Sequence, residues 1–515
     1  MKKNRIHFLL AITGTLLYAS VFSQQVQPAK AVADNLVIEN TIRQDPASFY
    51  YVDFKKYPKA DASLPIGVFD SGTGGMTVLE AILNYDKNNN GTKESGADHK
   101  ADFQNEKFIY LADQANMPYG NYYATGKSSL LIEHILKDAQ FMLSDKYYAD
   151  ANSPRFKTDK QLVKTIVIAC NTATAYGKKH LEEFMAKSGI QIKIIGVIDA
   201  GAKGALSLFG KNEDGSIGVM ATVGTVASKG YGNTLNEMKN KLGYAGNIQI
   251  YNQGGYGIAE AVDEEPDFID RKAVALRENY RGPSLQNDEY RIDKTLMDIY
   301  NFDFDHQKML CDTRVTDDCQ SLQINSTDNY VRYHLVTMME NIRKTPGAQP
   351  LKAILLGCTH YPYLKDDIKK VLHELYNYKK NDKYIYRHLM VENIELVDPA
   401  INVAEELYSF LRENNLLNRQ KTTGNSEFYI TVPNRDNPNV ITDKLGNFPY
   451  DYKYGRDVNE IQEYVKIVPY SKENISEETI VRFRKSIPAS FTQLVKFGQS
   501  NPKINSLAKD KRILD

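Results

Sequence analysis

Two short stretches of this chain decide its fold: Val167-Ile168-Ala169-Cys170-Asn171-Thr172 and Leu355-Leu356-Gly357-Cys358-Thr359-His360. Each is an apolar run that ends in a cysteine followed by small hydroxyl or amide residues. Such a run is typical of a buried parallel strand, and open α/β sheets place their ligands at the carboxyl ends of these strands. We therefore predict that the two thiols face each other across one small substrate.

Strand and helix patterns alternate on both sides of these stretches, which is typical of βαβ units and a parallel sheet. The fold class is therefore α/β. Strands are predicted at residues 66–69, 108–111, 163–169, 192–198, 217–221, 248–251, 353–357, 394–397 and 428–432. Helices are predicted at residues 76–84, 204–209, 230–241, 329–343, 401–412 and 477–497, with others capped by Ser128, beginning near Thr174 and following Pro362.

A secretory signal peptide is predicted at residues 1–23. Lys2, Lys3 and Arg5 precede an apolar stretch, which is followed by the small-residue site Val21-Phe22-Ser23, so cleavage is expected before Gln24. The apolar stretch is shorter than the roughly 20 residues of a membrane-spanning helix, which disfavours an uncleaved anchor. We expect an exported protein, periplasmic or extracellular, with no membrane span after signal removal.

Export changes the interpretation of the four cysteines, because oxidising compartments favour disulfides. Cys311 and Cys319 lie close together in a polar segment, and both a disulfide and two free thiols stay open. Cys170 and Cys358 have two alternatives to a reactive pair, namely buried structural thiols or a mutual disulfide. Neither alternative explains why similar polar residues follow both cysteines.

The overall charge indicates small-molecule partners. Sixty-four Lys and Arg residues balance 64 Asp and Glu residues, so nothing indicates nucleic-acid binding. The Asp70-Ser71-Gly72 turn follows a predicted strand and precedes a helix, a position that favours an anion. The glycines after it lack the dinucleotide spacing and a Walker lysine, so a small carboxylate fits better than a nucleotide.

The two thiols suggest proton transfer at a carbon acid. A helix N-terminus and a hydrogen-bonding neighbour lower a cysteine pKa toward neutrality, and we expect this of both thiols. Two such groups on opposite faces of one carbon remove a proton from one side and return one from the other. His360 would set the charge of Cys358, and Asp70 that of Cys170. Acyl transfer by Cys358 and His360 leaves Cys170 unexplained, and the cysteine and histidine spacing predicts no metal site.

The motifs resemble the cofactor-independent aspartate/glutamate racemase superfamily, and within it most closely the glutamate racemases. They occur in the order expected for that family, from Leu64 to about Asn415. The matching pieces are Gly67-Val68-Phe69-Asp70-Ser71-Gly72-Thr73-Gly74-Gly75, Tyr110-Leu111-Ala112-Asp113 with Pro118-Tyr119-Gly120, Ala169-Cys170-Asn171-Thr172-Ala173-Thr174, Ile195-Gly196-Val197-Ile198 and Leu356-Gly357-Cys358-Thr359-His360-Tyr361-Pro362.

The resemblance implies two similar parallel-sheet α/β domains that face each other across a central cleft. The first would comprise residues 64–195, completed by about 394–470, and the second residues 196–393, with an insertion at about 264–327. Residues 24–63 would form an N-terminal arm, packed on the surface or partly disordered. Residues 471–515 would form a C-terminal extension. The tail beyond Asn415 contains no reactive constellation, which favours a structural cover.

The resemblance also implies the chemistry: interconversion of L- and D-glutamate by a two-cysteine acid/base mechanism, without a cofactor. The catalytic residues would be Cys170, Cys358, Asp70 and His360, with Glu260 as a possible assisting carboxylate. The substrate would be bound by Asp70, Ser71, Pro118, Tyr119, Gly120, Asn171, Thr172, Thr359 and His360.

Two alternatives remain open from the sequence: racemisation of aspartate or a broader set of amino acids, and an exported protein that binds an acidic amino acid without turnover. Retention of both thiols speaks against the second. Members of this family normally serve cell-wall peptidoglycan synthesis in the cytoplasm and are shorter, so the export signal, the insertion and the extension are departures. A homodimer is compatible with the sequence, which does not fix the oligomeric state.

Overall fold

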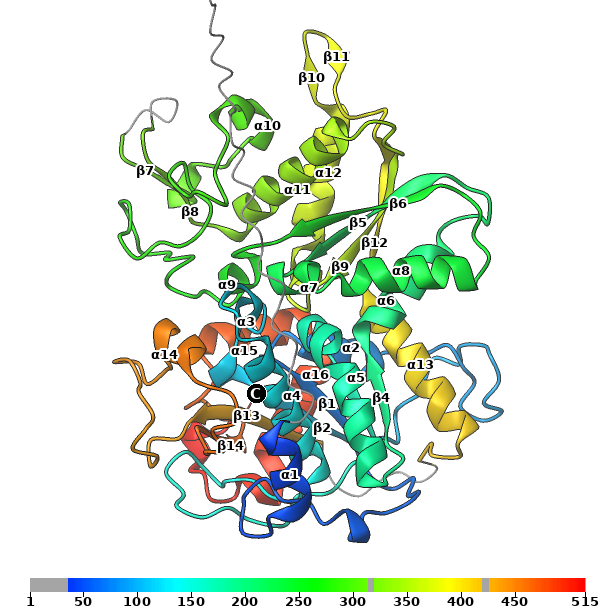
Figure 1. The fold of residues 1–515 in the computed structure, drawn as a ribbon, viewed down its shortest axis with the longest axis vertical. Helices are drawn as coiled ribbons and strands as arrows, with labels where there is room; N and C mark the ends of the chain where they lie inside the picture. Colours follow the sequence, from blue (N-terminus) through cyan, green and yellow to red (C-terminus); the bar gives the residue numbers. More distant parts are fainter. Residues whose placement is uncertain (1–35, 314–318, 419–425, 515) are drawn as a thin grey trace, which may run out of the picture.

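The computed structural model describes residues 36–313, 319–418 and 426–514. The predicted signal peptide lies outside the described residues. The described chain forms two lobes, each built around its own sheet, and Figure 1 shows one lobe above the other. We call them the six-stranded lobe and the four-stranded lobe. The predicted α/β class, with parallel sheets in two lobes, is confirmed.

The larger sheet has the strand order β14-β13-β2-β1-β3-β4. All neighbouring strands run parallel except β13 and β14, which pair antiparallel. Every residue of β1 and β2 is buried, which explains why these strands have continuous apolar sequences. The strands are β1 (Ile66–Asp70), β2 (Phe108–Ala112), β3 (Thr165–Ile168), β4 (Lys193–Gly196), β13 (Glu427–Pro433) and β14 (Val465–Pro469). Strand β14 was not predicted.

Helices of the six-stranded lobe follow or flank these strands. They are α1 (Val37–Gln44), α2 (Met76–Leu83), α3 (Asn121–Ala124), α4 (Ser128–Leu143) and α5 (Asn171–Ser188), with the short 3-10 helices η1 (Phe54–Lys56) and η2 (Gln114–Asn116). The predicted cap of α4 is wrong: Ser128 is already the first helical residue, and Lys127 before it makes no side-chain cap bond. Helix α5 begins earlier than predicted, directly after Cys170.

The smaller sheet has the order β12-β9-β5-β6, and all of its strands run parallel. Its strands are β5 (Gly215–Ala221), β6 (Ile248–Gly254), β9 (Leu351–Gly357) and β12 (Met390–Val397). The associated helices are α6 (Val197–Ser207), α7 (Val223–Ala227), α8 (Gly230–Lys241), α9 (Ile258–Val262), α11 (Thr327–Lys344), η6 (Tyr361–Leu364) and α12 (Lys365–Asn377). Residues 197–198, predicted as the end of a strand, are the first turn of α6.

After β12, the chain passes back between the lobes through α13 (Pro399–Glu413), which contacts α2 on one side and α6 on the other. The next strand of the larger sheet is β13. The domain boundaries near residues 195 and 394 stay predictions. A small hairpin, β10 (Lys379–Lys380) with β11 (Lys383–Tyr384), projects from the four-stranded lobe in Figure 1.

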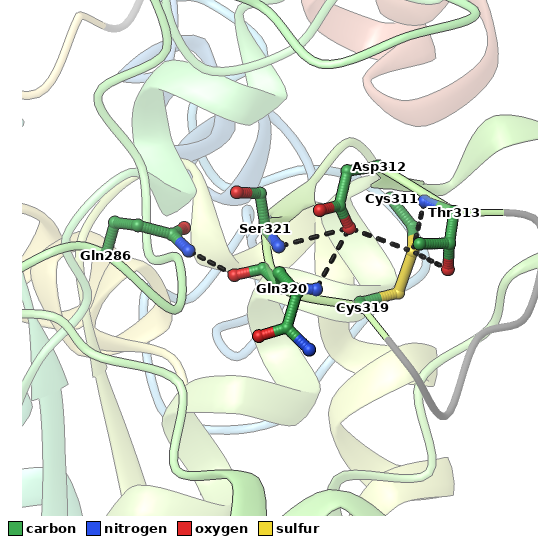
Figure 2. The surroundings of a disulfide bond; sticks show 7 residues. All are labelled: Gln286, Cys311, Asp312, Thr313, Cys319, Gln320 and Ser321. Atoms are coloured by element: carbon green, nitrogen blue, oxygen red, sulfur yellow. Dashed lines mark hydrogen bonds between the residues drawn. A yellow bond between two sulfur atoms is a disulfide. The ribbon is translucent and has the colours of Figure 1, made fainter.

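The predicted insertion has little regular structure. It contains η3 (Lys294–Leu296), α10 (Met297–Tyr300), η4 (Asp305–Gln307), and a hairpin of β7 (Met309–Cys311) and β8 (Leu322–Ile324). Cys311 and Cys319 form a disulfide, with their Cα atoms 5.7 Å apart (Figure 2), which resolves the question left open by the sequence. The apolar residues of the insertion, including Phe268, Ile269 and Tyr300, belong to the core of the four-stranded lobe.

The two terminal segments pack more deeply than their polar sequences indicate. Leu36, Ile38 and Ile42 of the N-terminal arm are buried in the core of the six-stranded lobe. The tail contains α14 (Tyr450–Gly455), α15 (Glu477–Ser486), α16 (Pro488–Ser500), η7 (Pro502–Ile504) and η8 (Lys509–Lys511). The single helix predicted at 477–497 is wrong, because Pro488 cannot continue the preceding helix and instead begins a new one.

No helix within residues 36–313, 319–418 and 426–514 is long and apolar enough to span a bilayer.

Candidate active site

Asp70 lies at the carboxyl end of β1 and connects the two lobes. Its Oδ2 accepts a hydrogen bond from the backbone N–H of Gly75 at 2.6 Å and from Thr359 Oγ1, in the other lobe, at 3.4 Å. Asp70 Oδ1 is buried and has no hydrogen-bond partner among the described residues. Burial raises the pKa of Asp70, against the opposing effect of His360. Asp70 Oδ1 is therefore a buried acceptor for which the described residues supply no donor.

Cys170 is the cap residue of α5, directly after β3. Its Sγ accepts a hydrogen bond from the backbone N–H of Ala173 at 3.4 Å and donates to Ser71 Oγ at 3.6 Å. Burial, and after it the Asp70 carboxylate, raises the pKa of the Cys170 thiol. The predicted lowering of this pKa by the helix N-terminus is therefore wrong, because desolvation and a neighbouring negative charge outweigh it. Burial and Asp70 therefore favour the thiol form of Cys170 over the thiolate.

Cys358 follows β9 and has a different set of neighbours. Its Sγ lies 3.5 Å from His360 Nδ1, and His360 Nε2 lies 2.9 Å from Asp263 Oδ2. Burial alone lowers the pKa of His360, but the Asp263 carboxylate outweighs this and holds the pKa well above its ordinary value. His360 thus lies between a thiol and a carboxylate, and the Asp263 carboxylate favours its charged form.

Asp263 is a site residue that the sequence analysis missed. It lies just after α9, and its Oδ1 accepts a hydrogen bond from Arg482 Nη2 at 3.0 Å. Burial acts to raise its pKa, but His360 and Arg482 hold it below its ordinary value. No local motif marks Asp263 or Arg482, which are brought together from segments more than 200 residues apart. Only the tertiary structure identifies them.

Glu260, the predicted assisting carboxylate, lies one helical turn before Asp263. It is buried in α9, and burial, followed by repulsion from Glu265, raises its pKa to about 7. The carboxylate that contacts His360 is that of Asp263, so Glu260 interacts with the histidine only electrostatically.

Further contacts bring the predicted substrate-binding residues against the opposite lobe. Thr172 Oγ1 lies 3.0 Å from Thr222 Oγ1 and 2.9 Å from Thr225 Oγ1. Asn171 Oδ1 accepts a short hydrogen bond from the Tyr231 hydroxyl. These side chains already have partners, so a substrate that bonds to them must displace contacts between the lobes.

A buried network of hydrogen bonds supports the loop at residues 118–120. The Tyr119 hydroxyl lies 2.5 Å from Asp113 Oδ2 and 2.7 Å from Asp138 Oδ2. Burial, and after it the negative charge of Asp113, raises the pKa of Asp138 well above its ordinary value. The hydroxyl is therefore occupied by these carboxyls, and the Pro118 carbonyl accepts from the Tyr454 hydroxyl of α14. The side chain of Tyr119 supports the loop rather than facing the substrate.

Gly74 lies where the two lobes approach each other closely. A Cβ added there would lie 2.7 Å from Thr359 Oγ1 and 2.8 Å from His360 Cε1, closer than Cβ atoms approach other atoms. Glycine is therefore needed at this position for the β1 turn to lie against the segment that follows Cys358.

The assembled site is closed. Its polar residues are at most 7% exposed: Asp70, Ser71, Cys170, Asn171, Thr172, Cys358, Thr359 and His360. These side chains are therefore almost inaccessible to solvent in this structure. A water-excluded site strengthens the electrostatic interactions within it.

One group of side chains of the kinds that bind metal ions lies close together among the described residues, but its atoms are already occupied. This group is Cys311, Asp312 and Cys319, in the insertion. Both sulfur atoms are already joined in the disulfide, and Asp312 Oδ1 accepts backbone hydrogen bonds from Gln320 and Ser321 (Figure 2).

The fold and the site define a class: two-lobed α/β proteins in which a buried cysteine follows a strand in each lobe and residues of both lobes meet in one buried polar cluster. The chain is also similar in sequence to the glutamate racemases, which confirms the resemblance seen in the motifs. It is 25% identical to the glutamate racemase of Lactobacillus johnsonii over 368 residues, covering 71% of this chain and 88% of the relative. It is 26% identical to that of Fusobacterium nucleatum over 372 residues, covering 72% and 90%.

Among solved structures, the chain matches a glutamate racemase from Francisella tularensis in complex with D-glutamate, with a TM-score of 0.39, 22% identity, and coverage of 72% of this chain and 87% of that one. It matches a glutamate racemase isoform from Bacillus anthracis with a TM-score of 0.40, 21% identity, and coverage of 72% and 88%. No family model matches the chain.

Proposed function

We propose that this protein is a cofactor-independent amino-acid racemase that interconverts L- and D-glutamate, with Cys170 and Cys358 as its two acid/base groups. The observation that supports this most strongly is the position of Asp70. It acts electrostatically on Cys170 and accepts a hydrogen bond from Thr359, the neighbour of Cys358, so both cysteine-bearing strand ends adjoin one buried carboxylate. The sequence similarity to glutamate racemases supports the same activity and substrate.

The two thiols have complementary environments, as a two-base reaction requires. Cys170 is held protonated by burial and by Asp70, whereas Cys358 adjoins the His360 imidazolium. In one direction, the Cys358 thiolate removes the α-proton and the Cys170 thiol donates its proton to the opposite face. One proton is taken and one is returned, so the amino acid leaves inverted, with Cys358 as a thiol and Cys170 as a thiolate. The opposite enantiomer uses the same groups in reverse.

The remaining polar groups orient the substrate and hold its charge. Asp70 Oδ1 accepts from the α-ammonium group, which compensates for the buried negative charge. The hydroxyls of Thr172 and Thr359, together with the Asn171 amide, bind the head group in place of their present partners in the opposite lobe. Closure of the lobes also removes water from the carbanion formed between the thiols.

The direct test uses purified protein with L-glutamate, L-aspartate and other L-amino acids in deuterium oxide under reducing conditions. Loss of the α-proton NMR signal, with loss of optical rotation for glutamate, is expected. Faster exchange with aspartate than with glutamate would identify aspartate as the preferred substrate. Exchange with many amino acids would indicate a broad-specificity racemase. Binding of glutamate without exchange would indicate a binding protein instead.

We further propose that the protein acts outside the cytoplasm, after removal of residues 1–23, and supplies or consumes D-glutamate of the cell wall. The Cys311–Cys319 disulfide supports this location, because disulfides persist in oxidising compartments. Cell fractionation and N-terminal sequencing of the mature protein test it, with Gln24 as the expected first residue. A homodimer stays a prediction, to be tested by light scattering.

A further inference from the structure

Arg482 belongs to the C-terminal extension. The extension packs on the six-stranded lobe, but the Arg482 side chain contacts residues of the four-stranded lobe. Its helix, α15, packs against α16, and α16 contacts α2 and β13 of the six-stranded lobe. Figure 1 shows α15 at the boundary between the lobes, near α9. The extension is therefore anchored in one lobe and reaches the other.

The Arg482 guanidinium makes three contacts with the four-stranded lobe. Nη2 donates to Asp263 Oδ1 at 3.0 Å, and Nη1 donates to the Val262 carbonyl. The guanidinium carbon also lies 5.5 Å from the centre of the Tyr363 ring. Asp263 bonds His360, and Tyr363 lies three residues after His360, so Arg482 contacts both the carboxylate partner of the histidine and the segment that carries it.

Because Asp263 Oδ1 bonds Arg482 and Asp263 Oδ2 bonds His360, the carboxylate is held in one orientation. Removing either donor frees the carboxylate to rotate away from the imidazole. We propose that Arg482 is a positioning residue for the racemase reaction: it bridges the closed lobes and fixes Asp263 against His360, so that the C-terminal extension completes the active site. This inference rests on the proposed function.

Other charged groups lie close to this bridge and contribute to any pH profile. Glu260 and Glu265 act on Asp263 and His360 from the α9 region, Asp70 acts from β1, and Lys453 acts on Glu265 from α14. Further titratable neighbours are Cys358 and Tyr363, from the segment that follows β9, and Tyr470, which follows β14 and interacts with Asp263. Arg482 is the group among these that donates directly to the Asp263 carboxylate from the extension.

The first experiment compares Arg482→Gln, Arg482→Lys and a control, Lys485→Gln, which changes an exposed residue of the same helix. Loss of a hydrogen bond to a charged group predicts a drop in kcat/KM of roughly 10- to 100-fold for Arg482→Gln. The acidic limb of the kcat/KM profile should move to higher pH, because Asp263 loses a group that holds it ionised. Arg482→Lys should restore part of both effects, and Lys485→Gln should behave as wild type.

A chemical rescue separates positioning from general support of the fold. Added guanidinium at concentrations below those that unfold the protein should raise the kcat/KM of Arg482→Ala, and should not raise that of wild type or Lys485→Gln. An unchanged rate and pH profile in Arg482→Gln, or no rescue of an impaired Arg482→Ala, would overturn the proposal.

A third measurement does not depend on activity. Hydrogen–deuterium exchange should increase in residues 258–263 and 477–486 of Arg482→Gln relative to Lys485→Gln, because the bridge between the lobes is lost. Equal exchange in the two variants would overturn the inference even if the protein had no racemase activity. If the wild-type protein has no racemase activity but exchange still increases in Arg482→Gln, the proposed function is refuted and the bridge made by Arg482 is not.

Discussion

His360 Nε2 lies 2.9 Å from Asp263 Oδ2, so the histidine next to Cys358 is paired with a carboxylate from another part of the four-stranded lobe. The pair is buried, with side chains 4% and 7% exposed. A buried charge pair of this kind fixes which ring nitrogen faces the thiol, because one nitrogen is committed to the carboxylate.

Replacement of this carboxylate should impair catalysis more than replacement of its neighbour in α9. Asp263→Asn should lower kcat/KM by about 10- to 100-fold, because the imidazolium loses its charged partner. Glu260→Gln should have a smaller effect, since Glu260 makes no direct contact with His360. Steady-state kinetics in both directions measure the two variants. A greater loss in Glu260→Gln would restore Glu260 as the assisting carboxylate.

The two thiols should each be essential. Cys170→Ser and Cys358→Ser should each lower racemisation by roughly 10²- to 10⁴-fold, since each removes one acid/base group. Circular dichroism and thermal unfolding should remain close to wild type, because serine replaces a small buried side chain. Full activity in either variant would refute the two-base assignment.

Lobe closure should depend on the absence of a side chain at residue 74. Gly74→Ala places a Cβ against Thr359 and His360. Such overpacking destabilises a protein by about 1–3 kcal/mol. We expect a lower kcat/KM, because the added Cβ destabilises mainly the closed, substrate-bound state. Gly232→Ala is the matched control, because a Cβ there meets no atom within 4 Å. Equal kinetics in the two variants would argue against the close approach.

The Asp263–His360 pair predicts a pH-dependent contribution to stability. The lowered pKa of Asp263 means that its contribution is present above the unfolded value of about 3.9 and is lost as pH falls through the folded pKa. The raised pKa of His360 means that its contribution is present below about 6.5 and is lost as pH rises through the folded pKa. The Tm difference between wild type and Asp263→Asn should therefore be largest between about pH 4 and 6.5. A difference that increases above that range would contradict the assignment.

The disulfide should contribute to stability without contributing to catalysis. Cys311 and Cys319 are 8 residues apart, and closure of such a loop restricts the unfolded chain by roughly 2–3 kcal/mol. The double variant Cys311→Ser/Cys319→Ser should therefore have a lower Tm and unchanged kcat/KM. A large loss of activity would link the insertion to the site.

The sequence predicted the strands that carry the chemistry because these strands are buried on both faces. Continuous apolar runs such as residues 66–69 and 353–357 have few alternatives to a central strand, and the polar residues that follow them mark the ligand edge of the sheet. Boundaries were predicted less well where a single residue decides them. Pro488 divides the last long helix, and α5 begins at the reactive cysteine itself.

The sequence by itself thus determined the α/β class, the paired cysteine motifs and Asp70, because each follows from a local run of residues. The tertiary structure alone decided the protonation of these groups. Burial beside Asp70 keeps Cys170 a thiol, although its place at a helix N-terminus favours a thiolate. The choice of Asp263 over Glu260, and the approach of Arg482 from the extension, depend on contacts between distant segments, which local sequence patterns do not contain.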